Sequence, residues 1–577
     1  MRHLRWQALI ALLGMVLVGS MLAGQGRVGN GPISVTQPVS GGVYTEALVG
    51  LPQRLNPLLD HANPVDRDID RLIFSGLTTF DASGKPVPDL ANWIIGEDQQ
   101  TYTFLLKPNL RWHDGEPLTA EDAAFTLRLL QDPAYPGPAD VGRLWQAVIV
   151  QVVNPQTLVL TLPEPFAPFL DYTAVGLLPA HLLKDVPAAQ LAQANFNLTP
   201  VGSGPFRFDR WLQSSGGELQ GVLLSAASST SGPKPLLTQV RFNFYPDATT
   251  AMAAYQQGEV LGLSRLDEAQ LTQALQRPEL NLYTTLRPEY SLIFLNQRSD
   301  ELPFFKEKKV RQALLLGLNR AAMVNDTLRG QAVVASSPVL PGSWAYNPDV
   351  PVAAYDPQAA ASLLDSAGWV FPSDATLGTD RYIRQKEGVP ISFTLTTTND
   401  PLHAALAQSA QSTWAKLGIQ AEVVLLDAAS LRGQALEPRQ FQALLVDFNL
   451  AGTPDPDPYP FWHETQAESG QNYGGFTDRK TSELLEQARI TSDITQRALL
   501  YRDFQSRFVD QVPALVLYYP VYNYAVDKSV GGVQLGPLTT LSDRFNGLSG
   551  WFLQTRTVVV EESSSTETPA GSATPTP

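Results

Sequence analysis

The stretch at residues 88–130 constrains the fold more than any other part of the chain. Within it, every second residue of 101–106 is apolar, which predicts a strand with one buried face. A turn is expected at residues 113–116, because glycine tolerates the positive φ that a tight turn needs. Thr119 precedes Asp122 by three residues, a pattern typical of a helix start, and apolar residues follow at helical spacing. This region therefore reads as strand, turn and helix.

The sequence motifs in this stretch point to a protein family more specifically than its predicted strand, turn and helix do. It contains PDLA, YTF, WHDG and PLTAEDAAFTL in that order. These strings closely resemble the signature of the family-5 extracellular solute-binding proteins, the oligopeptide- and dipeptide-binding components of ABC importers. The resemblance runs from about residue 41 to about residue 537. It implies an α/β, two-lobed fold of the periplasmic-binding-protein type II kind with an additional inserted domain, and lobes that close on a ligand about a hinge.

The length, 577 residues, exceeds what one hydrophobic core organises, so several domains are expected. The second lobe should contain a parallel pair of strands, because residues 391–426 read as strand, helix and strand. We expect the first lobe to comprise residues 41–84, 199–286 and 514–560, the inserted domain residues 85–198, and the second lobe residues 287–513.

Both ends of the chain differ from this core. Residues 1–24 have a basic start and an apolar run, which predicts an export signal or an uncleaved membrane anchor. Either one places the rest of the chain outside the cytoplasm. Residues 25–40 are expected to be a linker, and the Ser/Thr/Pro-rich residues 561–577 a disordered tail. The sequence has no cysteine, so the lipid-linked cysteine that anchors many such binding proteins is missing.

Composition and motifs argue against several other functions. The net charge of −15 disfavours nucleic-acid binding, which needs a basic surface. The 6 histidines lack metal-ligand spacing, and no phosphate-binding loop or HExxH string occurs. His113 is expected to be structural, and Ser203 lacks the GxSxG context of a nucleophile. We therefore expect no catalytic residue, no metal site and no cofactor.

The acidic loop at residues 446–478 is the strongest candidate for contacting a ligand, because it combines aromatic side chains, carboxylates and Gly/Pro backbone. In peptide-binding members of the family, an aromatic residue is followed three positions later by an aspartate that pairs with the peptide ammonium. The resemblance places the aromatic residue at Phe448 and the aspartate position at Ala451, so the carboxylate is missing. Asp455 or Asp457 could replace it from a shifted loop. Alternatively, these aspartates cap turns beside the prolines that follow them.

The other candidates lie in segments that correspond to ligand-facing segments of the family. They are mostly aromatic, and core packing would account for such residues equally well. The full set of predicted ligand-binding residues is Leu51, Trp145, Tyr290, Phe448, Asn449, Asp455, Asp457 and Tyr519.

The predicted function is transport-linked binding without catalysis. The resemblance implies a monomer that holds a short, extended peptide through backbone hydrogen bonds. It would deliver this peptide to permease subunits driven by separate ATPase chains. A non-peptide solute, such as an oligosaccharide or a metal complex, remains an alternative ligand because the ammonium-binding aspartate is missing. A hydrolase is a remote alternative.

Overall fold

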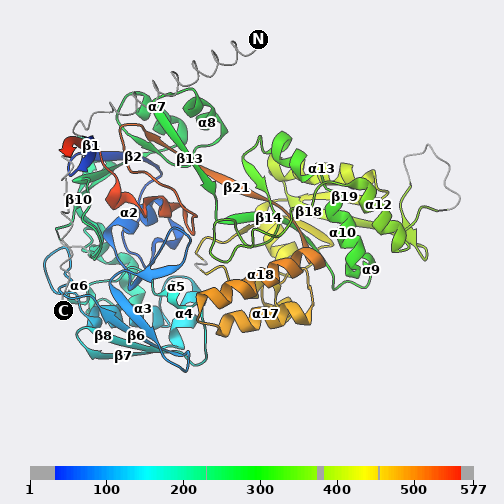
Figure 1. The fold of residues 1–577 in the computed structure, drawn as a ribbon, viewed down its shortest axis with the longest axis horizontal. Helices are drawn as coiled ribbons and strands as arrows, with labels where there is room; N and C mark the ends of the chain where they lie inside the picture. Colours follow the sequence, from blue (N-terminus) through cyan, green and yellow to red (C-terminus); the bar gives the residue numbers. More distant parts are fainter. Residues whose placement is uncertain (1–32, 229–230, 373–381, 453–454, 561–577) are drawn as a thin grey trace, which may run out of the picture.

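The computed structural model describes residues 33–228, 231–372, 382–452 and 455–560. The predicted export segment and tail lie outside these residues. The fold is the mixed α/β, two-lobed arrangement that the sequence predicts, with an additional smaller sheet (Figure 1). Among the described residues, no helix combines the length and the apolar composition needed to cross a membrane.

One long strand joins the two lobes. The 12-stranded sheet has the order β19-β18-β20-β14-β21-β12-β2-β11-β10-β9, with β13 and β15 also paired to β21. The first half of β21 (Ala514–Asp527) pairs with β14 (Glu289–Leu295), and its second half pairs with β13 (Leu280–Leu286). Figure 1 shows β21 running from one lobe into the other. The change of lobe therefore lies within this strand, several residues after the predicted return at residue 514.

The first lobe is built on the other side of that strand. In it, β2 and β11 are parallel, whereas β11, β10 and β9 are antiparallel neighbours. Helix α2 (Pro64–Ile73) begins at Asn63, whose side chain accepts a hydrogen bond from Val65 N, and has proline in its first turn. The strands are β2 (Val43–Val49), β9 (Phe206–Gln213), β10 (Leu219–Ala226), β11 (Gln239–Tyr245) and β12 (Gly262–Leu263).

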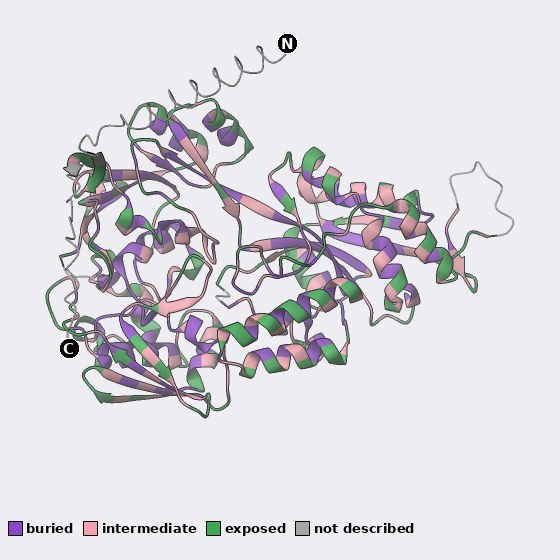
Figure 2. Ribbon diagram, in the orientation of Figure 1, coloured by how far each residue is buried: buried purple, intermediate pink, exposed green. Residues whose placement is uncertain are grey.

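The second lobe contains the predicted parallel pair. Strand β18 (Ser392–Thr398), helix α13 (Pro401–Ala415) and strand β19 (Gln420–Leu426) follow one another, and the two strands are parallel, which confirms the prediction. Strand β20 (Ala443–Asn449) lies between β18 and β14. Figure 2 shows these strands buried between helices with exposed outer faces, which are α10 (Lys308–Leu316), α12 (Pro357–Ser366), α17 (Arg479–Ile490) and α18 (Ile494–Gln511).

The smaller sheet belongs to the region predicted as the inserted domain. Its strand β6 (Thr101–Leu106) has the predicted bounds, and its alternate residues are buried. Helix α3 (Ala120–Gln131) has the predicted capping box, in which the Thr119 N–H donates to the Asp122 carboxylate at 2.9 Å. The sheet has the order β5-β6-β8-β7, and its other strands are β5 (Ala91–Ile95), β7 (Ile149–Asn154) and β8 (Thr157–Thr161).

The turn at residues 113–116 ties this region to the first lobe. His113 Nε2 donates to the Gly204 carbonyl at 3.0 Å, and Gly202 N–H donates to His113 Nδ1 at 3.3 Å. Burial lowers the pKa of His113 to about 4, so the ring is neutral and can accept the second bond. A side chain at Gly202 would collide with the Ile73 carbonyl oxygen, which explains the glycine. His113 is structural, as predicted.

One predicted segment is partly wrong. Residues 25–40 were expected to form a linker, but β1 (Ile33–Val39) pairs along its length with β22 (Gln554–Val560). This pairing was hidden in the sequence because its partner lies more than 500 residues away. The remaining elements are β3 (Thr78–Phe80), β4 (Pro86–Pro88), α4 (Ala139–Gln146), α5 (Phe169–Tyr172), α6 (Ala180–Leu183), α7 (Ala248–Gln256), α8 (Glu268–Leu275), α9 (Pro303–Lys306), α11 (Arg320–Ala322), β15 (Ala332–Val334), β16 (Gln385–Lys386), β17 (Val389–Pro390), α14 (Ala428–Ser430), α15 (Tyr459–Trp462) and α16 (Gln466–Ser469).

Candidate ligand-binding site

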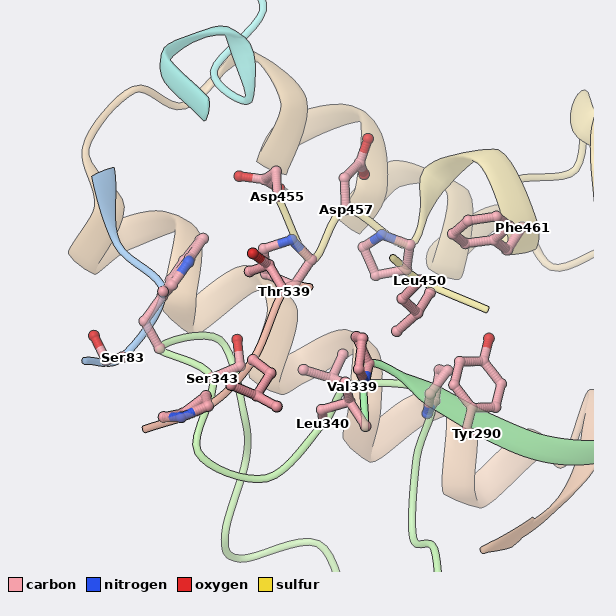
Figure 3. A pocket seen from close by; sticks show the side chains of 18 of the residues that line it. Ser83, Tyr290, Val339, Leu340, Ser343, Leu450, Asp455, Asp457, Phe461 and Thr539 are labelled. Carbon is pink, nitrogen blue, oxygen red and sulfur yellow. The ribbon is translucent and has the colours of Figure 1, made fainter. Parts of the chain in front are cut away.

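A cavity with largely aromatic and proline walls lies where the two lobes meet. We call it the aromatic cavity. It has an empty volume of about 720 Å³. Figure 3 shows Ser83 and Ser343 toward one side of it and Tyr290, Leu450 and Phe461 toward the other. The first-lobe segments contribute Ser83, Gly84, Pro537, Leu538 and Thr539, and the second lobe contributes Pro288, Tyr290, Pro338, Val339, Leu340, Ser343, Trp344, Leu450, Asp455, Pro456, Asp457, Pro458, Phe461 and Trp462.

Three polar groups with hydrogen-bond donors lie on the walls of the aromatic cavity. The Tyr290 hydroxyl and the indole N–H groups of Trp344 and Trp462 are buried, and the only side-chain donor acting on Tyr290 within the described residues is the Trp462 indole. Each can donate a hydrogen bond, and buried donors are rarely left unpaired. The cavity therefore offers donors to an extended ligand that brings its own acceptors, such as peptide carbonyl oxygens.

The two aspartates predicted to meet a ligand both line this cavity, but each has an arginine partner. Arg497 Nη2 pairs with the Asp455 carboxylate, and Tyr501 donates to it at 3.3 Å. Arg489 Nε pairs with Asp457 at 2.7 Å, and Asp457 also accepts from Tyr459 N–H at 3.0 Å. Figure 3 shows the Asp457 carboxylate pointing away from Leu450. Their role as ammonium partners stays a prediction.

Burial dominates the electrostatics of this pair of aspartates. Burial raises the pKa of Asp455 to about 6, while the Arg497 charge acts to lower it. Asp455 is thus ionised at neutral pH, and the neighbouring carboxylates favour the charged form of Arg497, whose pKa is raised despite its burial. The negative charge of Asp455 is balanced inside the protein before any ligand arrives.

A second cavity lies beside the first, on the first-lobe side. We call it the acidic cavity. Its empty volume is about 1260 Å³, and Thr539 lines both cavities. Two of its arginines are engaged, because Arg67 lies 3.6 Å from Asp60 and Arg71 lies 3.7 Å from Asp543. Its walls comprise Pro57, Leu58, Asp60, His61, Arg67, Asp70, Arg71, Phe74, Phe80, Leu130, Tyr135, Pro138, Val141, Trp145, Asp171, Tyr172, Ala174, Val175, Gly176, Gly452, Thr539, Thr540, Ser542 and Asp543.

Two buried aspartates of the acidic cavity contrast with those of the aromatic cavity. Asp70 and Asp171 are each 2% exposed. Their four carboxylate oxygens make no side-chain hydrogen bond within the described residues, although the Asn56 backbone N–H acts to lower the pKa of Asp70. Burial raises the pKa of both groups well above the ordinary value, and nearby carboxylates raise it further.

The remaining predicted residues separate into three groups. Trp145 lines the acidic cavity and packs against Phe169 with ring centroids 5.3 Å apart. Phe448 and Asn449 line a different pocket on the second lobe, although Phe448 also stacks on Tyr290. The last two candidates, Leu51 and Tyr519, line neither cavity.

Each of these last two residues has another evident role. The Tyr519 hydroxyl donates to the Ser337 carbonyl at 2.6 Å, which ties β21 to the loop after β15. Leu51 is 58% exposed, and its carbonyl accepts a hydrogen bond from the Asn63 side chain. Ala451, the position of the missing aspartate, is exposed, whereas the adjacent Gly452 lines the acidic cavity.

Sequence reasoning missed several residues of these cavities. Phe461 and Trp462 lie within the predicted acidic loop, so their neighbourhood was a usable signal. Trp344 and Thr539 come from separate parts of the chain, and no local sequence pattern identifies them as cavity residues. Asp70 lies on α2 among other charged residues, where an exposed helix face would have been the ordinary interpretation.

The lobes touch beside the cavities. The Ala167 N–H donates to the Arg489 carbonyl at 2.7 Å, and the Trp344 N–H donates to the Ser83 carbonyl at 3.1 Å. The Arg489 guanidinium also lies 5.5 Å from the centre of the Phe166 ring. Because these contacts are few, a change of angle between the lobes would break little structure.

Comparisons with known proteins agree with this architecture. The oligopeptide-binding protein AppA of Bacillus subtilis is 29% identical over 515 residues, covering 87% of this chain and 91% of that protein. The dipeptide-binding protein of Escherichia coli is 26% identical over 547 residues, covering 87% of this chain and 95% of that protein. The solved structure of NikZ from Campylobacter jejuni in complex with Ni(L-His) has a TM-score of 0.64 at 26% identity, and covers 88% of this chain and 99% of that chain.

A family model gives the most direct assignment. Residues 85–471, which include the inserted domain and most of the second lobe, match the model described as bacterial extracellular solute-binding proteins, family 5 Middle. The matched region contains the strand, turn and helix at residues 88–130 that first pointed to this family. The chain belongs to the family-5 bacterial extracellular solute-binding proteins, which are substrate-binding components of transport systems.

Proposed function

We propose that this protein binds a short peptide between its two lobes and delivers it to the permease of an ABC importer. The observation that carries the proposal is the aromatic cavity, whose walls come from both lobes and present buried hydrogen-bond donors on Tyr290, Trp344 and Trp462. An extended peptide has carbonyl oxygens along its whole length, which match such donors without strong side-chain selectivity. The two relatives described as oligopeptide- and dipeptide-binding proteins support a peptide ligand.

A non-peptide solute is the second candidate. Two findings favour keeping it: both aspartates of the aromatic cavity are already paired with arginines, and NikZ binds a nickel–histidine complex. Among the described residues, no group of three or more His, Cys, Asp or Glu side chains could hold a metal ion. A metal would therefore have to arrive with its own organic ligands.

Mass spectrometry of the ligand that remains bound through purification tests the proposal. The protein is purified from its exporting host without denaturation, and the released small molecules are identified. Peptides recovered from the native protein, but not from a heat-denatured and washed control, are expected. Recovery of only a sugar or a metal complex would replace the peptide by that solute.

Two accompanying features are part of the same proposal. The lobes should close about β21 on binding, so small-angle X-ray scattering should give a smaller radius of gyration with a verified ligand than without it. Residues 1–24 should direct export, so fractionation should find the protein outside the cytoplasm. The purified protein should be a monomer, which its mass in solution measures. A cytoplasmic protein that keeps residues 1–24 would contradict the export signal.

A further inference from the structure

We propose that Asp70 and Asp171 bind the positively charged groups of the ligand, its ammonium or guanidinium groups, in the acidic cavity. This inference rests on the proposed function and deepens it. It assigns the cation-binding role to two carboxylates that face the acidic cavity, instead of the arginine-paired carboxylates of the aromatic cavity.

Asp70 has a negative environment and no cationic partner. Its carboxylate lies on α2 and lines the acidic cavity, and both of its oxygens are buried; the Asn56 backbone N–H acts on it, but it forms no ion pair within the described residues. The charges that act on it come from Asp60 and Asp66, both negative. Arg71 lies on the same helix but donates to Asn546 Oδ1 at 2.9 and 2.6 Å. A ligand cation would supply the missing charge.

Asp171 also lines the acidic cavity, on the side nearer the second lobe. It lies on α5, and both of its carboxylate oxygens are also buried and unpaired among the described residues. Asp455 and Arg497 of the second lobe act on it from the other side of the lobe interface. Arg497 is hydrogen-bonded to Asp455 through Nη2, and its charge also acts to lower the pKa of Asp171. No hydrogen bond joins Arg497 to Asp171 in the part of the chain that the structure describes, so the Asp171 oxygens can still accept from a group that enters the cavity.

The walls around the two carboxylates suit an organic cation. Trp145, Tyr135, Tyr172 and Phe74 line the same cavity, and aromatic faces attract ammonium and guanidinium groups. Thr539 lines both cavities, so a ligand can place apolar or backbone parts in the aromatic cavity and a charged group in the acidic cavity. The space of about 1260 Å³ between these walls is continuous with the solvent, so a basic side chain can enter it from outside.

Protonation links the empty and occupied states. Burial raises the pKa of Asp70 and Asp171, so the empty cavity favours the protonated acids and avoids two uncompensated buried charges. A bound cation favours the carboxylate form, and the displaced proton passes to the solvent. Binding of a cationic ligand should therefore release protons, which calorimetry in two buffers of different ionisation enthalpy measures directly.

The test uses the full-length mature protein and a defined mixture of short peptides of graded length. Each peptide is present with a free amino terminus, with an acetylated amino terminus, and in an acetylated form containing lysine. Spermidine and agmatine form a separate, non-peptide arm. The retained compounds are quantified by mass spectrometry, for the wild type and for Asp70→Asn and Asp171→Asn. Asparagine has nearly the shape of a protonated aspartic acid, so both variants should fold.

Asp66→Asn is the matched control. Asp66 lies on the same helix as Asp70 and is equally buried, but its carboxylate accepts from Gln53 N–H at 2.7 Å and Arg54 N–H at 3.1 Å. It is absent from the walls of the acidic cavity, but its charge acts on Asp70, so this control removes a nearby charge without removing the proposed contact. We expect the wild type and this control to prefer cationic peptides over acetylated, lysine-free peptides, and to release protons when they bind them. Asp70→Asn or Asp171→Asn should lower the affinity for the cationic peptides about 30-fold or more and leave the affinity for the uncharged peptides unchanged.

The possible outcomes separate the inference from the function on which it rests. Equal retention of charged and uncharged peptides, or equal weakening of both by the variants, overturns the cation site and leaves peptide binding intact. Loss of discrimination in Asp455→Asn instead would move the cation to the aromatic cavity and also overturn it. Retention of the amines alone, dependent on Asp70 or Asp171, would support the site and refute the peptide. Retention of nothing would refute both.

Discussion

The two adjacent cavities bury carboxylates in opposite ways. In the aromatic cavity, Asp455 and Asp457 are paired with Arg497 and Arg489. In the acidic cavity, Asp70 and Asp171 are just as buried but form no ion pair within the described residues. A buried charge is costly unless it is compensated, so paired groups serve the fold, while unpaired groups are retained at a cost to stability. The difference separates carboxylates that hold the second lobe together from carboxylates that await a ligand.

Removing the arginine of the aromatic cavity should have the largest effect. Arg497→Met leaves Asp455 buried without a cation and beside Asp171, so the free energy of unfolding should fall by about 3–5 kcal/mol. Chemical denaturation at neutral pH measures this loss. Arg479→Met is the control, because Arg479 forms its ion pairs with Glu464, Glu483 and Glu486 while 57% exposed, and its loss should reduce stability far less than the loss of Arg497. Similar losses in the two variants would contradict the assigned role of the buried pair.

The unpaired carboxylates should make the ligand-free protein less stable as the pH rises. The pKa of Asp70 and Asp171 is raised in the folded state by burial, so above about pH 4 the native state binds more protons than the unfolded state. Their stabilising contribution is complete below the ordinary pKa and is lost as the pH rises through the raised value. Replacing both by asparagine should make this decline shallower, because asparagine does not titrate. The check is to measure the unfolding free energy of the wild type and of the double variant across this pH range. Parallel curves for the two proteins would contradict the prediction.

Removing single tyrosine hydroxyls should have a smaller effect, and this effect should distinguish hydroxyls proposed to contact the ligand from hydroxyls that stabilise the fold. The Tyr290 hydroxyl is buried and donates no hydrogen bond to the described residues, although the Trp462 indole acts on it, whereas the Tyr519 hydroxyl donates to the Ser337 carbonyl. Tyr290→Phe should therefore leave stability nearly unchanged and weaken peptide binding by about 0.5–1.5 kcal/mol. Tyr519→Phe should do the reverse and destabilise the protein by about 1 kcal/mol. Titration calorimetry and thermal unfolding of both variants would show the crossed pattern, or its absence.

The smallest effect is expected outside both cavities. Leu51 was a predicted ligand-binding residue, but it is 58% exposed and lines neither cavity. Leu51→Ala should change stability and peptide affinity by no more than about 0.5 kcal/mol. A clear loss of affinity, measured with the same peptide as for Tyr290→Phe, would mean that this loop reaches the ligand when the lobes close.

Local patterns were the reliable part of the sequence. The bounds of β6, the capping box of α3 and the parallel pair of β18 and β19 all follow from periodicities and turn residues within a few positions of one another. The family could also be recognised from one contiguous stretch. The strand pair of β1 and β22 could not be predicted, because nothing local tells a strand which distant segment will complete its hydrogen bonds.

The sequence by itself determined the family, the α/β class and the presence of an acidic, aromatic loop after β20. It could not determine which carboxylates have a compensating cation, because that depends on arginines contributed by α17 and α18, about 30 to 40 positions further along the chain. Nor did it mark Asp70 and Asp171, which lie about 100 positions apart and line one cavity only after the inserted domain has packed against the first lobe. The physical reason is that charge compensation is set by distance in space, which only the tertiary structure decides.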